Sequence, residues 1–179
     1  MSEIQTRPTI ASDLARLMGF DHSITSESVW QLELRRDAGQ STAIFREVRL
    51  PRSILIAYPR NPFALADDWS KRSMMYTALL DQDVVGYISL VERSMDSAAY
   101  VTDLVVHAAS RRRGVASALL SAAQDWSVAR AHRRLIVEMQ SKNLPAIRLV
   151  QKFGCEFCGY NDQYYLTQDV VLFFGKSLK

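Results

Sequence analysis

Two carboxylates stand in otherwise apolar segments, Asp103 in VTDLVV and Glu138 in LIVEM. Burial disfavours the charged form of a carboxylate, so its pKa rises and it can accept a proton near neutral pH. Such a group can deprotonate an amine, which is mostly protonated at neutral pH because a lysine-type amine titrates near ~10.4. Either residue can instead be a structural carboxylate satisfied by an arginine or by backbone groups, and both interpretations remain open at this stage.

A basic turn follows the first of these segments, in DLVVHAASRRRGVASALLSAA, residues 103–123. Unpaired backbone N–H groups and the helix dipole together make a helix start a site for anions. The arginines at 111–113 add positive charge, Gly114 lets the backbone approach a ligand, and Ala116 avoids crowding it. The turn lacks the Gly-Lys-Ser/Thr ending of a Walker A loop and the three glycines of a Rossmann fingerprint. It predicts a diphosphate site of another type, although three arginines alone are more often a solvated turn.

The elements that position these residues are clearest from residue 73 onward. SMMYTALL, VVGYISLVE and AAYVTDLVV are separated by short turns at 81–83 and 94–97, which predicts an antiparallel meander of three strands. Residues 112–130 have helical spacing, and their predicted apolar face consists of Val115, Leu119, Ala122 and Trp126.

The chain after this helix predicts a strand, a second helix and two further strands. RRLIVEM is too apolar for an exposed edge strand, and Asn143 can cap the helix that follows it. Gly154 can end this helix as its C′ residue, and strands are expected near 155–160 and 169–174. The inward stripe of the helix is predicted to be Ala146, Leu149, Val150 and Phe153. A meander followed by alternating helices and strands predicts an α/β fold, a mixed sheet with helices packed on it.

The amino-terminal part of the chain has weaker patterns. Glu3 to Ile10 can form a strand, and Ser12 is a candidate N-cap for a short helix in ASDLARLM. Residues 29–59 contain VWQLELRR, STAIFREVRL and SILIAY, which predict three strands with turns at DAGQ and LPR, with short helix as the alternative. The irregular stretch PRNPFALADDWSK is expected to be a loop with one helical turn.

Composition limits the class of protein. The 179 residues, 48% of them hydrophobic, suffice for one well-buried domain and are too few for two of ordinary size. No apolar run of about 18 residues could span a bilayer, and MSEIQTRPTI lacks the apolar core of a secretory signal, so no membrane contact and a cytoplasmic location are expected. The net charge is +3, but the basic pairs are scattered among acidic residues, which argues against a nucleic-acid partner.

The pair Cys155 and Cys158 forms a CxxC motif. There is no second cysteine pair and the three histidines are widely separated, so no zinc site or other metal site is predicted. A redox CxxC opens a helix, whereas this one follows a helix in a segment that looks extended. Two ordinary buried or half-buried thiols on opposite faces of a strand are expected, in a reducing compartment.

Two motifs resemble one family. VVHAASRRRGVASALL is similar to the Arg/Gln-x-x-Gly-x-Gly/Ala pyrophosphate loop of the GNAT superfamily of acetyl-CoA-dependent N-acetyltransferases, with Arg111, Gly114 and Ala116 at the matching positions. NLPAIRLVQKFGC resembles the family's Asn-x-x-Ala helix. Within the superfamily, AAYVTDLVV, LIVEMQSKN and GYNDQYYLTQDVVLFFGKSL look most like streptothricin acetyltransferases and secondarily like ribosomal-protein N-terminal acetyltransferases.

The resemblance implies a GNAT-like fold, a mostly antiparallel sheet flanked by helices, with acetyl-CoA as co-substrate and no metal. One domain over 1–179 is expected, with a variable acceptor-side portion at 1–72, an acetyl-CoA-binding core at 73–160, and a loop and strand at 161–179. The residues expected to contact acetyl-CoA are Leu104, Val105, Val106, Arg111, Arg112, Arg113, Gly114, Val115, Ala116, Asn143 and Ala146.

The resemblance also suggests catalytic roles. Glu138 is the first choice for the general base and Asp103 the second, and a backbone N–H near Val106 would stabilise the oxyanion. The tyrosine that usually acts as general acid is replaced by Val150, so water or another tyrosine must serve. Tyr164 is the best candidate among the tyrosines of the next segment, Tyr160, Tyr164 and Tyr165, which can equally be packing aromatics.

The predicted function is transfer of an acetyl group from acetyl-CoA directly to a primary amine of a small molecule, such as an aminoglycoside- or streptothricin-like antibiotic. The alternatives are a protein N-terminal acetyltransferase of the ribosomal-protein type and a non-catalytic acyl-CoA-binding domain. The acceptor is therefore a small amine or a protein N-terminus, and a homodimer is left open. A nucleic-acid module is disfavoured because aromatic residues are not interleaved with the basic ones.

Overall fold

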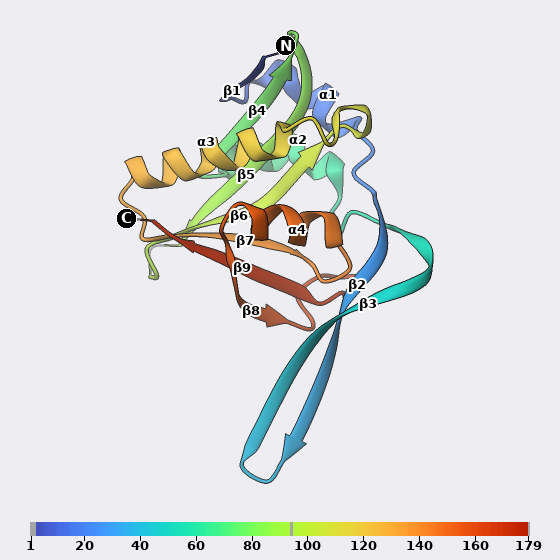
Figure 1. Cartoon of the computed structure of the whole chain (residues 1–179). Helices are drawn as coiled ribbons and strands as arrows, with labels where there is room; N and C mark the ends of the chain where they lie inside the picture. The colour runs from blue at the N-terminus through green and yellow to red at the C-terminus, as the bar shows by residue number, and fades with distance from the viewer. Residues whose placement is uncertain (1–2, 94, 179) are drawn as a thin grey trace.

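The computed structural model describes residues 3–93 and 95–178. Its centre is a seven-stranded sheet in the order β1-β4-β5-β6-β7-β9-β8, in which every neighbouring pair is antiparallel except β6 and β7 (Figure 1). The predicted α/β fold with a mostly antiparallel sheet is thus confirmed. The strands are β1 (Ile4–Pro8), β4 (Met74–Leu80), β5 (Asp83–Arg93), β6 (Ala98–Val106), β7 (Arg134–Gln140), β8 (Glu156–Asn161) and β9 (Val171–Ser177).

Helices cover both faces of this sheet. The helices α3 (Val115–Ala129) and α4 (Leu144–Lys152) lie on one face (Figure 1), and the short helices α1 (Leu14–Met18) and α2 (Leu65–Asp68) pack on the other. Successive strand residues point to opposite faces, so Ile88 packs under α3 while its neighbour Tyr87 packs under α1. Both predicted long helices are confirmed, although their buried stripes also include Leu120, Ala123 and Ile147.

Of the two residues predicted as helix N-caps, one is confirmed and the other is wrong. Asn143 caps α4 as predicted, since its side chain accepts a hydrogen bond from the Ala146 N–H at 3.1 Å. The predicted N-cap Ser12 is wrong, because it lies inside a 3₁₀ turn that precedes α1. Asp13, the third residue of that turn, accepts from the N–H of Ile10, the residue that precedes the turn, at 3.0 Å and pairs with an arginine of β1.

Residues 29–59 form one long hairpin instead of three strands. Strands β2 (Ile24–Asp37) and β3 (Gln40–Ile56) pair as a separate two-stranded ribbon that projects well beyond the sheet (Figure 1). The LPR stretch lies within β3, at a register irregularity opposite Glu27. Pro51 lacks the N–H that a regular ladder needs, so it occupies a bulge and bends the strand without reversing it. The turn predicted at LPR is therefore wrong, and these residues form a bulge within one strand.

The region 62–71 contains more helix than expected, a 3₁₀ turn, α2 and a second 3₁₀ turn. Of the two cysteines, Cys155 is buried and Cys158 is exposed, so the expectation of partial burial fails for the second thiol; both are free. Burial raises the pKa of Cys155 to about 11, which keeps it protonated and unreactive at neutral pH. Within the part of the chain that the structure describes, no helix has the length and apolar character needed to cross a membrane.

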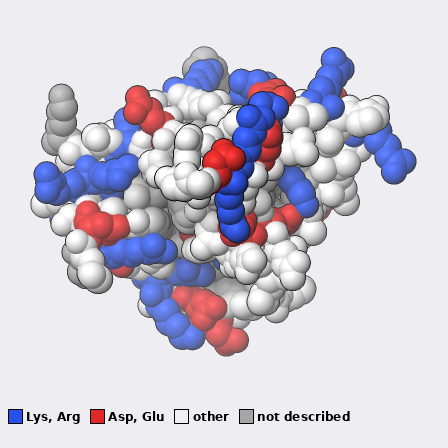
Figure 2. Space-filling view, turned by 90° about the horizontal axis from the view of Figure 1, so that it is seen from below, with Lys and Arg blue, Asp and Glu red and all other residues white. Residues whose placement is uncertain are grey.

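Charged side chains are spread over the surface. In the view from below, basic and acidic residues alternate over the face shown and do not gather into one basic patch (Figure 2). This interspersion agrees with the scattered charges of the sequence and offers the phosphates of a nucleic acid no continuous counter-charge on that face.

Candidate active site

The site begins where two central strands separate. Strands β6 and β7 pair in parallel from Ala98 and Arg134 to Val101 and Val137, where their ladder ends. Thr102 is an extra residue in β6, because Ser89 of β5 pairs with Asp103 while the next residue of β5 pairs with Val101. Such a bulge bends a strand and redirects the side chains beyond it. It turns Asp103 and the end of β6 away from β7 and opens a gap between the strands.

A cavity of about 560 Å³ occupies this gap and continues to the basic turn. Gly114 is the N-cap of α3 with a φ of +89°, a backbone conformation that residues with a β-carbon rarely adopt. The residues predicted to bind acetyl-CoA are brought together here, since the lining includes Leu104, Val105, Val106, Arg111, Arg112, Gly114, Val115, Ala116, Asn143 and Ala146. Arg113 is exposed and lies outside the lining.

The guanidinium of Arg111 is already engaged by the protein backbone. It donates to the carbonyl oxygens of Val106, Asp21 and Ser23 at 3.0, 3.0 and 2.9 Å. Arg111 therefore holds the turn against the end of β6 and against the segment that leads into β2. In this structure the side chain of Arg111 orders the turn, so its predicted contact with acetyl-CoA stays a prediction.

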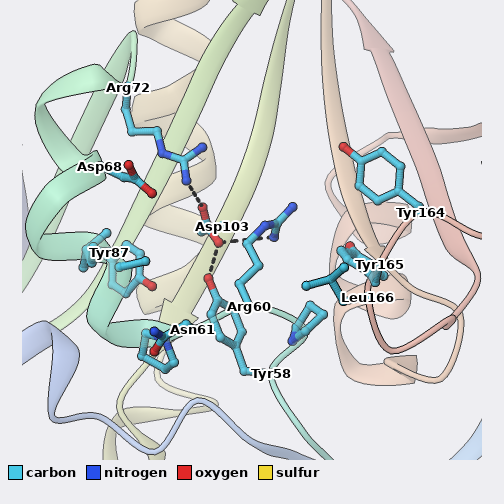
Figure 3. A pocket seen from close by; sticks show the side chains of 14 residues that line it. Tyr58, Arg60, Asn61, Asp68, Arg72, Tyr87, Asp103, Tyr164, Tyr165 and Leu166 are labelled. Carbon is cyan, nitrogen blue, oxygen red and sulfur yellow. Dashed lines mark hydrogen bonds and ion pairs between the residues drawn. The ribbon is translucent and has the colours of Figure 1, made fainter.

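Asp103 lies at the inner end of the cavity and is 5% exposed. Its carboxylate accepts hydrogen bonds from the hydroxyls of Tyr58, Ser89 (2.6 Å) and Thr102 (2.9 Å), and Arg72 lies 3.8 Å away (Figure 3). Arg60 lies 3.3 Å away on the other side. The carboxylate is thus held by three hydroxyls between two guanidinium groups.

Glu138 lines the same cavity from β7 and is 6% exposed. It forms an ion pair with Arg60 and accepts a hydrogen bond from the Tyr164 hydroxyl at 2.8 Å. Arg60 also donates to the Thr102 carbonyl at 2.8 Å, so one guanidinium bridges the two diverging strands. The structural interpretation considered for both carboxylates therefore holds in part, because each is paired with an arginine.

The environment separates the pKa values of these carboxylates. Burial is the largest influence on Asp103 and would raise its pKa, but Arg60, Ser89 and Tyr58 outweigh it and the pKa lies below its ordinary value. Burial is also the largest influence on Glu138, and there it prevails over the attraction of Arg60, so the pKa of Glu138 is raised. Glu138 is consequently the stronger base of the two, and Asp103 the more persistent anion.

A second cavity, of about 460 Å³, meets the first at Asp103, whereas Glu138 lines the first cavity alone. The two share Tyr58, Pro59, Arg60, Asp103 and Tyr165 as lining residues. The remaining walls of the second cavity come from α2 and the segments on either side of it, from Tyr87 of β5, and from the loop between β8 and β9 (Figure 3). One ligand can therefore reach Asp103 from the basic turn and another from the second cavity.

Residues 42–155 match the acetyltransferase (GNAT) family. The chain belongs to this family. The match begins within β3 and includes the meander, the basic turn and the Asn143 helix, so the resemblance inferred from the two motifs is confirmed. GNAT enzymes use acetyl-CoA as co-substrate.

Individual relatives make the comparison more specific. A streptothricin acetyltransferase from Escherichia coli is 31% identical over 112 residues, an alignment that covers 63% of this chain and 64% of that protein, slightly less than two thirds of its length. The crystal structure of nourseothricin acetyltransferase superposes with a TM-score of 0.81 at 21% identity, covering 98% of this chain and 99% of the other. A Bacillus anthracis protein described as a streptothricin acetyltransferase, solved with acetyl coenzyme A, gives 0.78 at 20% identity, with 99% of both chains covered. These structures establish the GNAT fold for the whole chain.

The tyrosines considered for the general acid of this GNAT protein occupy different places. Tyr160 lies on β8 and packs against Phe45, with 5.1 Å between the ring centroids. Tyr164 directs its hydroxyl to Glu138 and lines only the second cavity, whereas the buried Tyr165 lines both. Val150 is fully buried at the wall of the first cavity.

Replacing Tyr164 by phenylalanine is expected to lower kcat only a few-fold. The hydroxyl lost in Tyr164→Phe tunes Glu138, and since it does not line the first cavity it is not placed to protonate a thiolate there. A general acid would contribute roughly a hundredfold or more. Steady-state kinetics decide between these roles, and a hundredfold loss with unchanged acetyl-CoA affinity would restore Tyr164 as the acid.

Sequence reasoning missed the residues that tie this GNAT site together. Both Tyr58 and Arg60 lie in the chain just after β3: Tyr58 ends the segment SILIAY, which was predicted as a strand, and Arg60 belongs to the stretch that was described only as irregular. Their carboxylate partners are 43 to 78 positions away in the chain, so spacing gives no signal. His22 and Tyr87 were passed over as an isolated histidine and a strand aromatic, yet both lie beside Tyr58.

Proposed function

We propose that this protein transfers an acetyl group from acetyl-CoA directly to a primary amine of a small, streptothricin-like molecule. The observation that carries the proposal is the meeting of two cavities at Asp103 and Arg60, with Glu138 at the end of the first. Direct transfer needs both substrates bound at once with the amine next to the thioester, and two cavities with a shared wall allow that.

The end of β6 supplies hydrogen-bond donors for the thioester. The His107 N–H donates to the Val85 carbonyl of β5 at 2.8 Å. Alternate residues of a strand direct their N–H groups to the same side, so the N–H groups of Leu104 and Val106 are directed away from β5, toward the gap where the β7 ladder has ended. Donors fixed in this way stabilise negative charge that develops on the thioester carbonyl oxygen.

The second cavity suits an amine that must lose a proton. Tyr58, Tyr87, Tyr164 and Tyr165 supply aromatic walls, which attract cations. The guanidinium groups of Arg60 and Arg72 stand beside the carboxylates and disfavour a second positive charge nearby. A bound ammonium is thereby drawn into the site while its pKa is lowered, so that Glu138 can take its proton.

The leaving group is the thiol of coenzyme A, and its departure needs little assistance from the enzyme. A thiol has an ordinary pKa near ~8.5, so coenzyme A can leave as a thiolate without a dedicated acid. This agrees with the apolar Val150 at the wall of the first cavity, where a tyrosine would otherwise stand. Water that reaches the open cavity can then protonate the sulfur.

The substrate class rests on the relatives. The Escherichia coli protein and the Bacillus anthracis protein carry the name streptothricin acetyltransferase, and the other solved structure carries the name nourseothricin acetyltransferase. We therefore expect turnover with streptothricin in a panel that also contains a polyamine and a peptide with a free N-terminus, followed by release of free thiol. Turnover of the peptide alone would favour the protein N-terminal alternative, and acetyl-CoA binding without any thiol release would favour the non-catalytic one.

Acetyl-CoA is expected to stabilise the fold by ~2.7 kcal/mol at a hundredfold excess over its Kd. Gly114→Val should abolish this shift, because valine disfavours the φ of +89° and the turn that presents N–H groups must then rearrange. Thermal melts with and without the ligand measure both. Gly39→Val is the matched control, since Gly39 has a φ of +77° at the hairpin tip, away from the cavity. No shift in the unmodified protein would contradict the proposed function.

A further inference from the structure

The side-chain amide of Gln140 joins three segments of the chain. Gln140 is the last residue of β7, two positions after Glu138, and is 4% exposed. Its side-chain nitrogen donates hydrogen bonds to the Asp169 carboxylate at 2.8 Å and to the Ala57 carbonyl at 3.3 Å. These partners are 29 and 83 positions away in the chain. One buried side chain on the strand that carries Glu138 therefore holds two distant segments.

Both partners of Gln140 belong to segments that form the second cavity. Ala57 directly precedes residues 58–60, which line both cavities. Asp169 lies near the end of the loop between β8 and β9, in which residues 164–166 line the second cavity. Gln140 itself lines the first cavity and not the second. Its two hydrogen bonds thus attach two walls of the second cavity to the strand that lines the first.

The bond to Asp169 has an anionic acceptor. The side chain of Asp169 is 13% exposed, and burial, the largest influence, would raise its pKa. Hydrogen bonds from Lys142, Gln140 and the Thr167 hydroxyl outweigh burial, and the pKa of Asp169 lies below its ordinary value. A hydrogen bond to a carboxylate is stronger than one between neutral groups. The contact between Gln140 and Asp169 is therefore the stronger of the two that the amide makes.

The chemistry of the partners explains why an amide stands at this position. A carboxylate and a main-chain carbonyl can only accept, so the NH₂ group of Gln140 faces both of them and its oxygen faces away. A single nitrogen with two hydrogens can donate to the two segments at once. Methionine at this position has no donor, although it fills a similar space.

The main chain at the end of β7 is held without this side chain. The Ser141 N–H donates to the Val170 carbonyl at 2.9 Å, and the Asn143 N–H donates to the Gln140 carbonyl at 2.9 Å. The start of β9 and the turn into α4 therefore stay in place when the amide is lost. The amide acts on the loop before Asp169 and on the segment that follows β3.

We propose that Gln140 is a positioning residue that sets the affinity for the acceptor amine by holding two walls of the second cavity against β7. It acts through Asp169 and the Ala57 carbonyl. Without its two hydrogen bonds only a fraction of the molecules has the cavity formed, and the apparent Kd for the acceptor rises by the inverse of that fraction. Catalysis in the bound complex is unchanged. The role in acceptor binding rests on the proposed function.

The kinetic test separates KM from kcat for streptothricin at saturating acetyl-CoA. Gln140→Met is expected to raise KM about tenfold and to change kcat by less than about twofold, because it lowers the population of the formed cavity. Asp169→Ala should act in the same way, and Asp169→Asn should restore most of the affinity, since it keeps an oxygen for the amide. The effects of Gln140→Met and Asp169→Ala should not multiply in the double variant, because both remove one shared hydrogen bond.

Two control variants accompany the kinetic test. Gln151→Met makes the same chemical change at an exposed residue of α4 outside both cavities and should leave KM in place. Lys142→Met removes the partly exposed ion pair of Asp169 but keeps the bond from Gln140, and should raise KM less than about threefold. A loss confined to kcat in Gln140→Met, or effects that multiply in the double variant, would overturn the role of Gln140.

A second measurement needs no acceptor and so separates this role from the proposed function. Hydrogen exchange of the main-chain amides, followed by mass spectrometry, should be faster at 57–61 and 162–168 in Gln140→Met and unchanged in α3. Gln151→Met should leave all three segments unchanged. Unchanged exchange in Gln140→Met would show that the amide does not hold the two walls, even if the protein acetylates amines. Faster exchange in a protein that acetylates no amine would support the positioning by Gln140 and contradict the proposed function alone.

Discussion

Replacing Glu138 by glutamine is expected to lower turnover by about a hundredfold or more while acetyl-CoA affinity changes little. The glutamine keeps the size of the side chain and can still bond to Tyr164 and Arg60 through its oxygen, but it cannot accept a proton. Glu138 has a raised pKa because it is buried, so in the unmodified enzyme activity should fall as the pH drops through that pKa and the base becomes protonated. That acidic limb should disappear in Glu138→Gln.

The measurement is a pH profile of kcat and kcat/KM, with acetyl-CoA affinity taken separately from thermal melts. Glu92→Gln is the matched control, because Glu92 pairs with Arg130 and His132 outside both cavities and the same chemical change there should leave turnover intact. If Glu138→Gln retained full turnover, the base role would pass to Asp103 or to water.

The acetyl-CoA side of the site could be predicted because it depends on local structure. An apolar strand, a basic turn with Gly114 and a helix start follow one another directly in the chain, and Asn143 caps the next helix in the same local way. Backbone donors at helix starts and caps arise from neighbouring residues, so spacing alone reveals them. The role of Arg111 could not be foreseen, because its three carbonyl partners include two from residues about ninety positions earlier.

The acceptor side of the site could not be predicted, because its side chains come from segments that lie far apart in the chain. Asp103 and Glu138 were recognised as unusual because each interrupts an apolar strand, but their partners come from a loop with no periodic pattern. Arg60 is a single arginine between two prolines, and only the path of the chain after the long hairpin brings it to the carboxylates. The extra residue Thr102, which separates β6 from β7, also leaves no mark in a run of alternating apolar residues.

Arg60→Met is expected to reduce the free energy of unfolding by about 3 kcal/mol at neutral pH, because it leaves two buried carboxylates without their shared cation. Methionine has a similar length and keeps the apolar contacts of the arginine stem, so the loss of stability measures mainly the effect of the missing charge. Turnover should fall as well, since the guanidinium that joins β6 to β7 and faces the acceptor is gone. Arg46→Met is the control, an exposed hairpin arginine beside Glu33 whose loss should change stability by less than about 0.5 kcal/mol.

The pH dependence distinguishes loss of this charge from loss of packing. In the unmodified protein Asp103 has a lowered pKa, so its contribution to stability is lost as the pH falls through that pKa. Without Arg60, both carboxylates should titrate above their unfolded values, and the variant is then destabilised as the pH rises and they ionise while buried. The stability curves of the two proteins should therefore converge toward acid pH and diverge toward alkaline pH in urea unfolding. A gap of constant size across the range would mean that Arg60 stabilises the site by packing alone, and that the carboxylates do not depend on its charge.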